Sequence, residues 1–552
     1  MLQLENLSWE IFHLIFDYLN TYDLLNAFRN LNENLITILN SYHRIQLNFK
    51  RIKKTKFDFI CQHVQCEQIQ SIYLADDDYT PNQIETFMSL IPLIKCSNLQ
   101  SIRIEHISNA DLLNLLVSHL DDHQQLRSLN IQCSSISINK KTDKYISDVL
   151  SNLPELKYLQ ICSSSILVPL KSTLNQLTHL TIDLCKQNEL SKFLRWIPNL
   201  IYLHISNSYG DQTVELNVFL EHLKCLIIQS RVWMLFDHVE KIFSMTPNLQ
   251  CLQLETPGEF ALLNGNRWES IIKSKVPHLK QFTFDISPEE NTLTKDAILQ
   301  TFQTPFWLLE KHCRVACMIS TVTDTCVRLF SIPPCQPVND WYPPSEGFAI
   351  HSSVSYQFND YINEISISHF PVENDINSLI KLKSVRTLTV YCPIHRVEQL
   401  EQIMNLTSIQ HLIVNRLIDG SAFSELLQSA FNINQLTIKS KGSVPAWTSF
   451  AVDKFVFEQI KTLNAQDQIC KSEQIDALSQ IFPQLEYLRL RLEDKADIIS
   501  ICKKFPCLIG AVIDFNVPVK NIEEFFNENE ICLNGSYKYE ITRLRIWMGD
   551  IY

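Results

Sequence analysis

A short apolar phrase that recurs along most of the chain restricts its fold more than any other feature. The phrase has the form L-x-x-L-x-I and is clearest at Leu156–Ile161, Leu177–Ile182 and Leu200–Ile205. Its fourth and sixth positions alternate with polar ones, a pattern typical of a half-buried β-strand. Units of ~20–30 residues cannot bury their own apolar faces, so they stack on their neighbours and form a solenoid.

The phrases fall into two runs separated by an irregular stretch. The first run begins at Ile69, Leu99, Leu126, Leu156, Leu177, Leu200, Leu223, Leu249 and Leu279, and the second at Val385, Ile409, Ile433, Ile460, Leu485, Leu508 and Ile541. Residues between the phrases carry helical periodicity, as at Phe193, Leu194 and Ile197. The chain is therefore predicted to alternate strands with helices.

Proline marks the end of many of these predicted helices. It lies two residues before the phrase at Pro154, Pro198, Pro247, Pro277, Pro483 and Pro506. Because proline lacks an N–H group and cannot continue a helix, it ends the helix and leads the chain into the next strand. This order resembles the leucine-rich repeat, which implies an α/β fold: an irregular solenoid with a curved parallel sheet inside and helices outside. The alternative is a doubly wound α/β domain with a parallel sheet.

Residues 285–384 interrupt the repeats. The segments Cys313–Ile319, Cys326–Phe330 and Ile365–His369 read as strands, and Pro333–Pro344 is a proline- and aromatic-rich loop. We expect irregular repeats with a hairpin and an exposed loop here, although a break between two domains is an open alternative. The predicted repeat runs are then residues 69–284 and 385–552.

The N-terminus does not repeat and predicts two or three short helices. Ile11, Phe12, Ile15, Phe16 and Leu19 form a broad apolar stripe on the first helix, with Glu10, His13 and Asp17 on its other face. Ser8 is placed to cap this helix, and Asp23 to stabilise the start of the next. Two or three short helices within ~40 residues cannot bury all of this apolar surface against one another. Part of it must therefore contact a partner or the first repeats.

These N-terminal residues resemble an F-box. The matching pattern is Leu7-x-x-Glu10-Ile11-Phe12-x-x-Ile15-Phe16-x-Tyr18-Leu19-x-x-x-Asp23-Leu24. The resemblance implies an F-box at residues 1–47, followed by a linker helix within 48–68. F-box proteins dock on a Skp-type adaptor of a cullin-RING ubiquitin ligase, and a C-terminal domain selects the substrate. The positions that match the family's adaptor contacts are Leu7, Ser8, Ile11, Phe12, Ile15, Phe16 and Leu19.

This sequence departs from the family in two places. Ser8 stands where the family has proline, and Leu31-Asn-Glu-Asn-Leu35 replaces the usual Cys/Arg-x-Trp ending. The alternative interpretation is a helical cap that only shields the core of the first repeat, because the ends of a solenoid need covering. The chain would then be a leucine-rich-repeat scaffold or inhibitor without an adaptor.

The open face of the predicted sheet is the expected surface for an unknown substrate protein. The third and fifth positions of each phrase point away from the core, and neighbouring strands lie ~4.8 Å apart, so these side chains form contiguous strips. Exposed tyrosines anchor interfaces because they bury a large area and keep a hydroxyl group free. The candidate substrate-binding residues are Tyr158, His179, Tyr202 and His204, with a second strip at Tyr487 and Arg489.

Composition excludes several other classes of function. The net charge of −12 repels phosphate backbones, so no nucleic-acid partner is expected. No stretch reaches the ~18–20 apolar residues that span a bilayer, and the first residues lack a secretory signal. The 17 cysteines show no disulfide framework, which favours a reducing compartment, cytoplasmic or nuclear. The basic segment Lys50–Lys56 is interpreted as a solvated helix end, with a nuclear-import patch as the alternative.

No catalytic, metal or cofactor site is expected. Only 9 glycines are present, and no phosphate-cradling glycine motif occurs among them. Cys61, His63 and Cys66 offer zinc-ligand chemistry, but no second pair follows at zinc-finger spacing, so they are assigned to the helix before the strand at Ile69. Local spacing assembles no Ser/His/Asp or Cys/His set. The prediction is a non-catalytic subunit of a ubiquitin ligase.

Overall fold

The computed structural model describes residues 7–107, 109–133, 140–161, 170–183, 187–208, 216–288, 294–320, 326–332, 348–352, 363–367, 382–392, 396–415, 420–439, 456–529 and 537–549. The chain divides into two compact units. The first unit comprises Met1–Pro257 and Ser270–Gln281, and the second comprises Gly258–Glu269 and Phe282–Tyr552.

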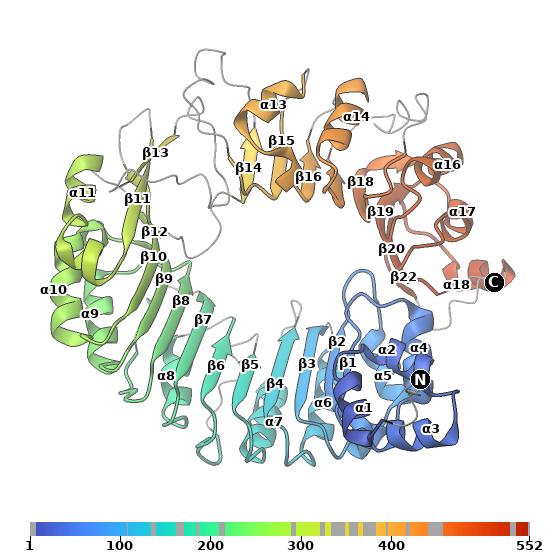
Figure 1. Ribbon diagram of the computed structural model, residues 1–552, viewed down its shortest axis with the longest axis horizontal. Helices are drawn as coiled ribbons and strands as arrows, with labels where there is room; N and C mark the ends of the chain where they lie inside the picture. Colours follow the sequence, from blue (N-terminus) through green and yellow to red (C-terminus); the bar gives the residue numbers. More distant parts are fainter. Residues whose placement is uncertain are drawn as a thin grey trace. The chain divides into compact units, whose positions relative to one another are not determined.

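The strands of the first unit follow one another in sequence order and are parallel (Figure 1). They are β1 (Ile45–Asn48), β2 (Ile69–Ala75), β3 (Ser101–Ile107), β4 (Ser128–Cys133), β5 (Tyr158–Ile161), β6 (His179–Ile182), β7 (Tyr202–Ser208), β8 (Cys225–Ser230) and β9 (Cys251–Gly258). The register brings equivalent phrase positions together, as in Leu159 beside Leu180 and Leu180 beside Leu203. These leucines are fully buried, which explains why the phrase recurs: each strand must contribute the same apolar residue to a continuous core.

The helices of the first unit either precede its first strand or lie between strands, where they cover one face of the sheet (Figure 1). They are α1 (Trp9–Phe16), α2 (Thr21–Phe28), α3 (Glu33–Asn40), α4 (Lys54–His63), α5 (Gln83–Leu90), α6 (Ala110–Leu120), α7 (Lys140–Ser151), α8 (Gln187–Leu194) and α9 (Phe236–Met245), with short 3₁₀ turns at η2 (Cys66–Gln68) and η3 (Leu93–Lys95). The prolines act as predicted, since α9 ends at Met245, just before Pro247. No helix in the described ranges is long and apolar enough to cross a lipid bilayer.

The strand order rules out the doubly wound alternative. A doubly wound sheet reverses its strand order at a switch point and carries helices on both faces. The first unit instead adds each strand beside the previous one, and its helices lie on one side. The fold is therefore a stack of strand–helix units of the leucine-rich-repeat kind. Strand β1 was not predicted; it lies at the end of the segment assigned to the F-box and pairs with β2.

The second unit begins with antiparallel strands. They are β10 (Gln281–Pro288), β11 (Arg314–Ser320), β12 (Cys326–Ile332) and β13 (Phe348–Ser352), in the order β10-β12-β11-β13. The hairpin of β11 and β12 confirms the two strands predicted in the irregular stretch. Helices here are α10 (Gly265–Lys275), which includes residues of both units, and α11 (Lys295–Thr301), with a 3₁₀ turn η5 (Phe260–Leu263) and a π-helical turn η6 (Phe306–Glu310). The proline-rich loop lies outside the described residues.

The rest of the second unit returns to parallel repeats. Its strands are β14 (Glu364–Ile367), β15 (Thr387–Val390), β16 (His411–Val414), β17 (Gln435–Ile438), β18 (Thr462–Cys470), β19 (Tyr487–Leu492) and β20 (Gly510–Phe515), followed by β21 (Tyr537–Glu540) and β22 (Arg543–Trp547). The helices are α13 (Glu398–Ile403), α14 (Gly420–Ser429), α16 (Ser472–Ile481), α17 (Asp497–Lys504) and α18 (Ile522–Glu528), with a 3₁₀ turn η9 (Leu406–Ser408).

The last predicted phrase is not a repeat. Ile541 is exposed, has a φ of 50°, and lies in the turn between β21 and β22. Strand β22 runs antiparallel to both β20 and β21, so the chain ends its sheet with a hairpin. Leu544 and Ile546 alternate with polar residues, and this alternation is the same for a parallel and an antiparallel strand. The sequence pattern therefore could not show that this strand is antiparallel, and the prediction of a repeat at Ile541 was wrong.

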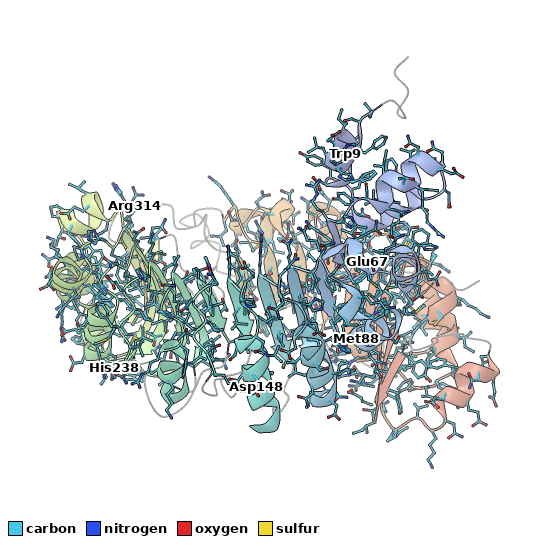
Figure 2. All side chains as sticks on the ribbon, turned by 90° about the horizontal axis from the view of Figure 1, so that it is seen from below. Trp9, Glu67, Met88, Asp148, His238 and Arg314 are labelled. Atoms are coloured by element: carbon cyan, nitrogen blue, oxygen red, sulfur yellow. The ribbon has the colours of Figure 1, made fainter. Side chains whose placement is uncertain are left out.

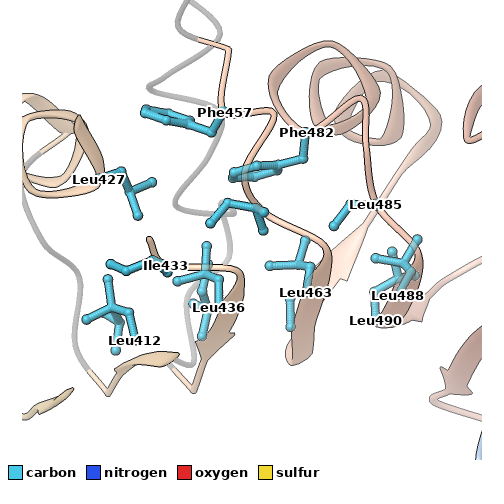
Figure 3. Packing of buried hydrophobic residues seen from close by; sticks show 14 of the residues in the cluster. Leu412, Leu427, Ile433, Leu436, Phe457, Leu463, Phe482, Leu485, Leu488 and Leu490 are labelled. Carbon is cyan, nitrogen blue, oxygen red and sulfur yellow. The ribbon is translucent and has the colours of Figure 1, made fainter. Parts of the chain in front are cut away.

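Buried leucines form the core of the second unit (Figure 3). Leu412, Leu436, Leu463 and Leu488 lie side by side on neighbouring strands, and the register pairs each with the next. Phe457 and Phe482 pack on the helix side of this row, with ring centroids 6.1 Å apart. One apolar core therefore runs along these repeats on the helix side of the sheet. The other face of the sheet carries the side chains that alternate with the buried ones.

Candidate partner-binding surfaces

The N-terminal module begins with two helices; a side-chain N-cap hydrogen bond forms at α2 but not at α1, where Ser8 was predicted to supply it. Ser8 occupies the N-cap of α1 in extended backbone conformation, and a hydrogen bond from its side chain lowers the pKa of the Glu10 carboxyl. At α2 the N-cap is Asn20, whose side chain accepts a hydrogen bond from the Asp23 backbone N–H at 2.9 Å and donates one to the Asp23 carboxylate at 2.6 Å. Asp23 thus stabilises the start of α2, as expected, but it does so through Asn20.

Two of the predicted adaptor contacts are core residues instead. Phe12 and Phe16 are 0% and 1% exposed. Phe16 packs against Phe28 of α2 and against Tyr42, with ring centroids 5.0 Å and 5.4 Å away. Since a fully buried ring cannot touch a second protein, the assignment of Phe12 and Phe16 to the adaptor surface is corrected: they hold α1 onto α2 and onto Tyr42, which follows α3.

The polar face predicted for α1 also has a packing role. The Asp17 carboxylate accepts a hydrogen bond from the Tyr42 hydroxyl at 2.7 Å and pairs with Arg44 at 3.3 Å. Burial and this hydrogen bond raise the pKa of Tyr42, so the phenol keeps the proton that it donates. The His13 ring stacks edge-on against Tyr42 at 5.2 Å. Tyr42 therefore anchors α1 from a position that the helical pattern alone does not reveal.

A second set of apolar side chains, on α1 and just after its end, faces solvent. Ile11, Leu14 and Tyr18 are 42%, 58% and 91% exposed, at sequence spacings of i, i+3 and i+7. Ile11 and Leu14 lie on α1, and Tyr18 lies in the turn that follows its last residue, Phe16. Leu7, Ile15 and Leu19 are half-buried, and Ser8 is exposed. We call Ile11, Leu14 and Tyr18 the outer stripe. Leu14 and Tyr18 were not among the predicted contacts, yet their spacing from Ile11 was visible in the sequence.

Helices α2 and α3, and not α1, pack on the first repeats. Thr21 on α2 donates a hydrogen bond to the Gln46 carbonyl of β1 at 2.8 Å, and Tyr22 stacks on Phe59 of α4 at 5.4 Å. From η2, the buried amide of Gln68 donates to the Leu39 carbonyl of α3 at 2.7 Å. Figure 2 shows Trp9 at the outer end of this module, far from Met88 of the repeats. The covering of the first repeat is thus done by α2 and α3.

The open face of the first unit carries the predicted aromatic strip. Tyr158, His179 and Tyr202 occupy equivalent positions on β5, β6 and β7. The His179 ring lies 4.5 Å from Tyr158 and 5.6 Å from Tyr202, at interplanar angles of 32° and 26°. Tyr158 is 49% exposed, whereas His179 and Tyr202 are half-buried. The structure therefore brings three predicted residues into one stacked row, here called the aromatic ladder.

A second row runs beside the aromatic ladder. His204 on β7 lies next to Thr181 on β6, and its Nε2 atom is 3.1 Å from the Gln229 side-chain oxygen. On β4, Asn130 donates a hydrogen bond to Gln160 at 2.7 Å. Among the described outward positions of these two rows from β4 to β8, no carboxylate, amine or guanidinium occurs; the residues are Ser128, Asn130, Tyr158, Gln160, His179, Thr181, Tyr202, His204, Cys225 and Ile227. Burial lowers the pKa of His179, which keeps it neutral at pH 7.

Charge appears at the N-terminal margin of this face. Glu105 of β3 is buried, accepts a hydrogen bond from the Tyr73 hydroxyl at 2.8 Å, and is paired with Arg103. Lys50 also approaches Glu105, at 3.4 Å. Burial acts to raise the pKa of Glu105, but the hydrogen bonds from Tyr73 and Arg103 outweigh it, so the pKa is lowered and the carboxylate stays ionised. Lys50, from the basic segment after the F-box match, is therefore part of the sheet surface.

Two cysteines continue the aromatic ladder on β8 and β9. Cys225 and Cys251 are in register and half-buried. A hydrogen bond from the Cys225 thiol lowers the pKa of Cys251 to about 7, against the opposing effect of burial. This hydrogen bond therefore favours the thiolate form of Cys251, and the thiolate is the nucleophile.

We expect Cys225→Ala to slow the alkylation of Cys251 at pH 7 by about threefold. Removal of the donor raises the pKa of Cys251, and the loss of thiolate outweighs the higher intrinsic nucleophilicity of a more basic thiol. Iodoacetamide labelling followed by peptide mass spectrometry measures this rate. The half-buried Cys507, in the second unit, provides the internal reference. An unchanged or faster rate at Cys251 would show that the thiol–thiol hydrogen bond does not set its reactivity.

The second predicted strip is only partly exposed. Tyr487 is 6% exposed, so its assignment as a substrate contact is corrected: it is a buried residue in this structure. Arg489 stays half-buried, and its Nε atom lies 3.4 Å from the Asp514 carboxylate of β20. Asp514 also accepts a hydrogen bond from Arg543 of β22 at 2.7 Å.

The possible zinc ligands lie where the sequence placed them. Cys61 and His63 are on α4, Cys66 is on η2, and the His63 ring is 2.6 Å from the Phe59 carbonyl, one turn earlier. Burial raises the pKa of Cys61, which disfavours the thiolate that a metal ion needs. Within the described ranges, no three His, Cys, Asp or Glu side chains are grouped so that they could hold a metal ion.

Comparison with known proteins gives no family assignment. No protein-family profile matches the chain, and no curated protein matches it. Among solved structures, a leucine-rich-repeat protein of Leptospira interrogans shows 13% identity and a TM-score of 0.23, covering 83% of this chain and 98% of its own. The PEPR1–AtPEP1 structure shows 12% identity and a TM-score of 0.19, covering 84% of this chain and 65% of that one. At these values the matches carry no argument about function, and the fold rests on the chain's own strands and helices.

Proposed function

We propose that this chain is the substrate-recognition subunit of a Skp/cullin/F-box ubiquitin ligase. The outer stripe of α1 is the observation that carries the proposal. A helix that served only as a cap would bury its apolar residues against the repeats. Here α2 and α3 already do so, while Ile11, Leu14 and Tyr18 remain in water. A row of apolar side chains at helical spacing is the form in which a helix fits the groove of a partner.

The open face of the first unit supports a role in binding a target protein. The chain carries a net charge of −12, yet the aromatic ladder and the row beside it lack ionised amines, guanidinium groups and carboxylates from β4 to β8. Cores of protein interfaces are similarly depleted in charge and enriched in aromatic residues. Tyr158 and Tyr202 would therefore act as anchors, with Asn130, Gln160 and His204 supplying hydrogen bonds.

In this proposal the chain is not itself an enzyme. The receptor holds the target close to a conjugating enzyme carried by the rest of the ligase, and so raises the effective concentration of the target's lysines. No cofactor is required for that role. The second candidate function is that of a leucine-rich-repeat scaffold or inhibitor. The aromatic ladder supports this function equally well. The two candidates differ at the outer stripe, which binds an adaptor only in the ligase proposal.

Replacement of Ile11 by glutamate tests the adaptor contact. We expect the dissociation constant for a purified Skp-type adaptor to rise by roughly tenfold to a hundredfold, because a charge placed in a desolvated contact is left unpaired. The thermal midpoint should be unchanged, since Ile11 is exposed in the free chain. Co-purification and isothermal titration measure the effect.

The matched control is Leu90→Glu on α5, which makes the same kind of change at an exposed apolar residue of the same unit. This variant should bind the adaptor as the natural chain does. Failure of the natural chain to co-purify with the adaptor would favour the scaffold. Full binding by Ile11→Glu would rule out the outer stripe as the contact.

A further inference from the structure

Cys225 and Cys251 lie directly beside each other on the open face of the first unit. They are in register on the parallel strands β8 and β9. Adjacent strands are ~4.8 Å apart, which lies within the ~4.4–6.8 Å that separates the Cα atoms of a disulfide. Both side chains point to the same face, because they alternate with the buried Leu226 and Leu252. The spacing and direction of the two cysteines are therefore compatible with a disulfide.

A small molecule in solvent has access to both thiols. Each cysteine is half-buried, and so is the next outward residue on each strand, Ile227 on β8 and Gln253 on β9. Cysteines of the core differ in this respect, since Cys470 is 1% exposed. The pair thus combines close approach of two thiols with an open path to them.

The two thiols differ in how readily they ionise. Cys225 donates a hydrogen bond to Cys251, which raises the pKa of the donor and lowers the pKa of the acceptor. Cys251 is therefore the nucleophile of the pair, and Cys225 keeps its proton. Oxidant-responsive cysteines have this arrangement: a solvent-accessible thiolate forms the first product, and a second thiol beside it resolves that product.

We propose that Cys251 and Cys225 are a peroxide-responsive pair that closes into a disulfide between β8 and β9. The Cys251 thiolate attacks one oxygen of hydrogen peroxide, so that an S–O bond forms while the O–O bond breaks. The departing hydroxide takes a proton from solvent and becomes water, and Cys251 becomes a sulfenic acid. The sulfur of Cys225 then attacks the sulfur of Cys251. The S–S bond forms, the S–O bond breaks, and the thiol proton leaves with the hydroxide as a second water.

Reduction returns the pair to its starting state. Two molecules of a low-molecular-weight thiol reduce the disulfide by exchange and become a disulfide themselves, so the pair can cycle in reducing surroundings. Cys225 is in register with Tyr202, which places the new bond at the end of the aromatic ladder. The proposal depends neither on the adaptor nor on a target protein, and it holds equally for a ligase subunit and for a scaffold.

A second pair of neighbouring thiols provides the matched control. Cys66 of η2 and Cys96, which follows η3, are also joined by a hydrogen bond, and Cys66 is half-buried. Burial raises the pKa of both thiols, so neither thiolate is favoured. Proximity of two thiols without a favoured thiolate should therefore not be enough for oxidation by peroxide.

The test treats the reduced full-length chain with hydrogen peroxide and then caps the remaining thiols with N-ethylmaleimide. Mass spectrometry of peptides prepared without reduction identifies each linked pair. We expect the link between Cys225 and Cys251 to form at least about tenfold faster than a link between Cys66 and Cys96, because the thiolate is the species that attacks the peroxide. Dithiothreitol should restore both thiols. Equal rates for the two pairs, or an oxidised Cys251 that never links to Cys225, would overturn the proposal.

Two variants separate the roles of the two cysteines. Cys225→Ser keeps a hydroxyl donor beside Cys251 but removes the resolving sulfur, so the sulfenic acid should accumulate and react with dimedone at least about tenfold more than in the natural chain. Cys251→Ser should leave Cys225 unmodified over the same time, because this thiol keeps its proton. Equal dimedone labelling of Cys251 in Cys225→Ser and in the natural chain would contradict the resolving role of Cys225. The measurement on the natural chain does not depend on either variant folding.

Discussion

Phe12→Ala is expected to reduce the free energy of unfolding of the N-terminal helices by about 3–5 kcal/mol, the usual cost of truncating a buried phenylalanine. Phe12 is fully buried, and its ring lies 6.0 Å from Phe16 and 6.3 Å from Phe28. The deletion leaves a cavity between α1 and α2 that two neighbouring rings line. Because α1 is held on the module largely through these rings, its amides should lose protection against hydrogen exchange.

Leu14→Ala is the matched control for this prediction. It removes an apolar side chain of similar size from the same helix, but Leu14 faces solvent, so the change in stability should stay within ~0.5 kcal/mol. Hydrogen-exchange mass spectrometry on α1 and α3, together with urea unfolding, measures both variants. Equal exchange in Phe12→Ala and in the natural chain would mean that Phe12 is not part of the core.

The two kinds of α1 variant have different signatures. Phe12→Ala should lose adaptor binding together with protection of α1, whereas Ile11→Glu should lose binding alone. A pull-down by itself cannot distinguish a contact residue from a residue that positions the contact. Measuring stability and binding on the same variants makes that distinction.

Trp307→Ala is expected to cost about 3–5 kcal/mol in the second unit. Trp307 is fully buried, its ring lies 5.1 Å from Phe302 and 5.8 Å from Phe282, and its indole N–H donates to the Gly265 carbonyl at 3.2 Å. Truncation therefore removes both a large apolar surface and the partner of a buried carbonyl. Residue 265 must be glycine for this packing, since a Cβ there would lie 2.5 Å from the Thr301 carbonyl oxygen.

Leu309→Ala tests whether the loss of stability in Trp307→Ala is caused by the burial of the truncated side chain. Leu309 is in the same helical turn as Trp307 but is exposed, so its truncation should leave the urea midpoint almost unchanged. Trp307→Phe keeps a ring and loses the N–H donor, and it should fall between the two. We expect stability to rise from Trp307→Ala to Trp307→Phe to the natural chain. A Trp307→Ala variant as stable as Leu309→Ala would contradict the conclusion that burial of Trp307 stabilises the second unit.

The repeat strands could be read from the sequence because one rule governs them all. Leu180 is buried by Leu159 and Leu203 on either side, so each unit needs the same residue at the same position. That requirement is local and periodic, and it appears directly as a phrase. The aromatic ladder follows from the same rule, because positions that alternate with buried leucines in adjacent parallel strands must be neighbours.

The N-terminal site could be predicted only in outline. The sequence indicated that α1 is apolar, but it has apolar residues on two faces, and helical spacing does not tell which face packs inward. Tyr42 decides this point, since it binds Asp17 and stacks on Phe16. The pairing of Arg489 with Asp514 depends likewise on strand β20, which lies beyond the range of local spacing.

The sequence by itself determined the period, the identity of the core residues in the repeats and the strand and helix alternation, because these depend on contacts between like positions of neighbouring units. Only the tertiary structure decided which apolar residues of the first helix remain in water, that the chain turns antiparallel at β22, and which arginines share a carboxylate. Those features depend on single contacts between dissimilar segments distant in the sequence, and no repeated pattern encodes such contacts.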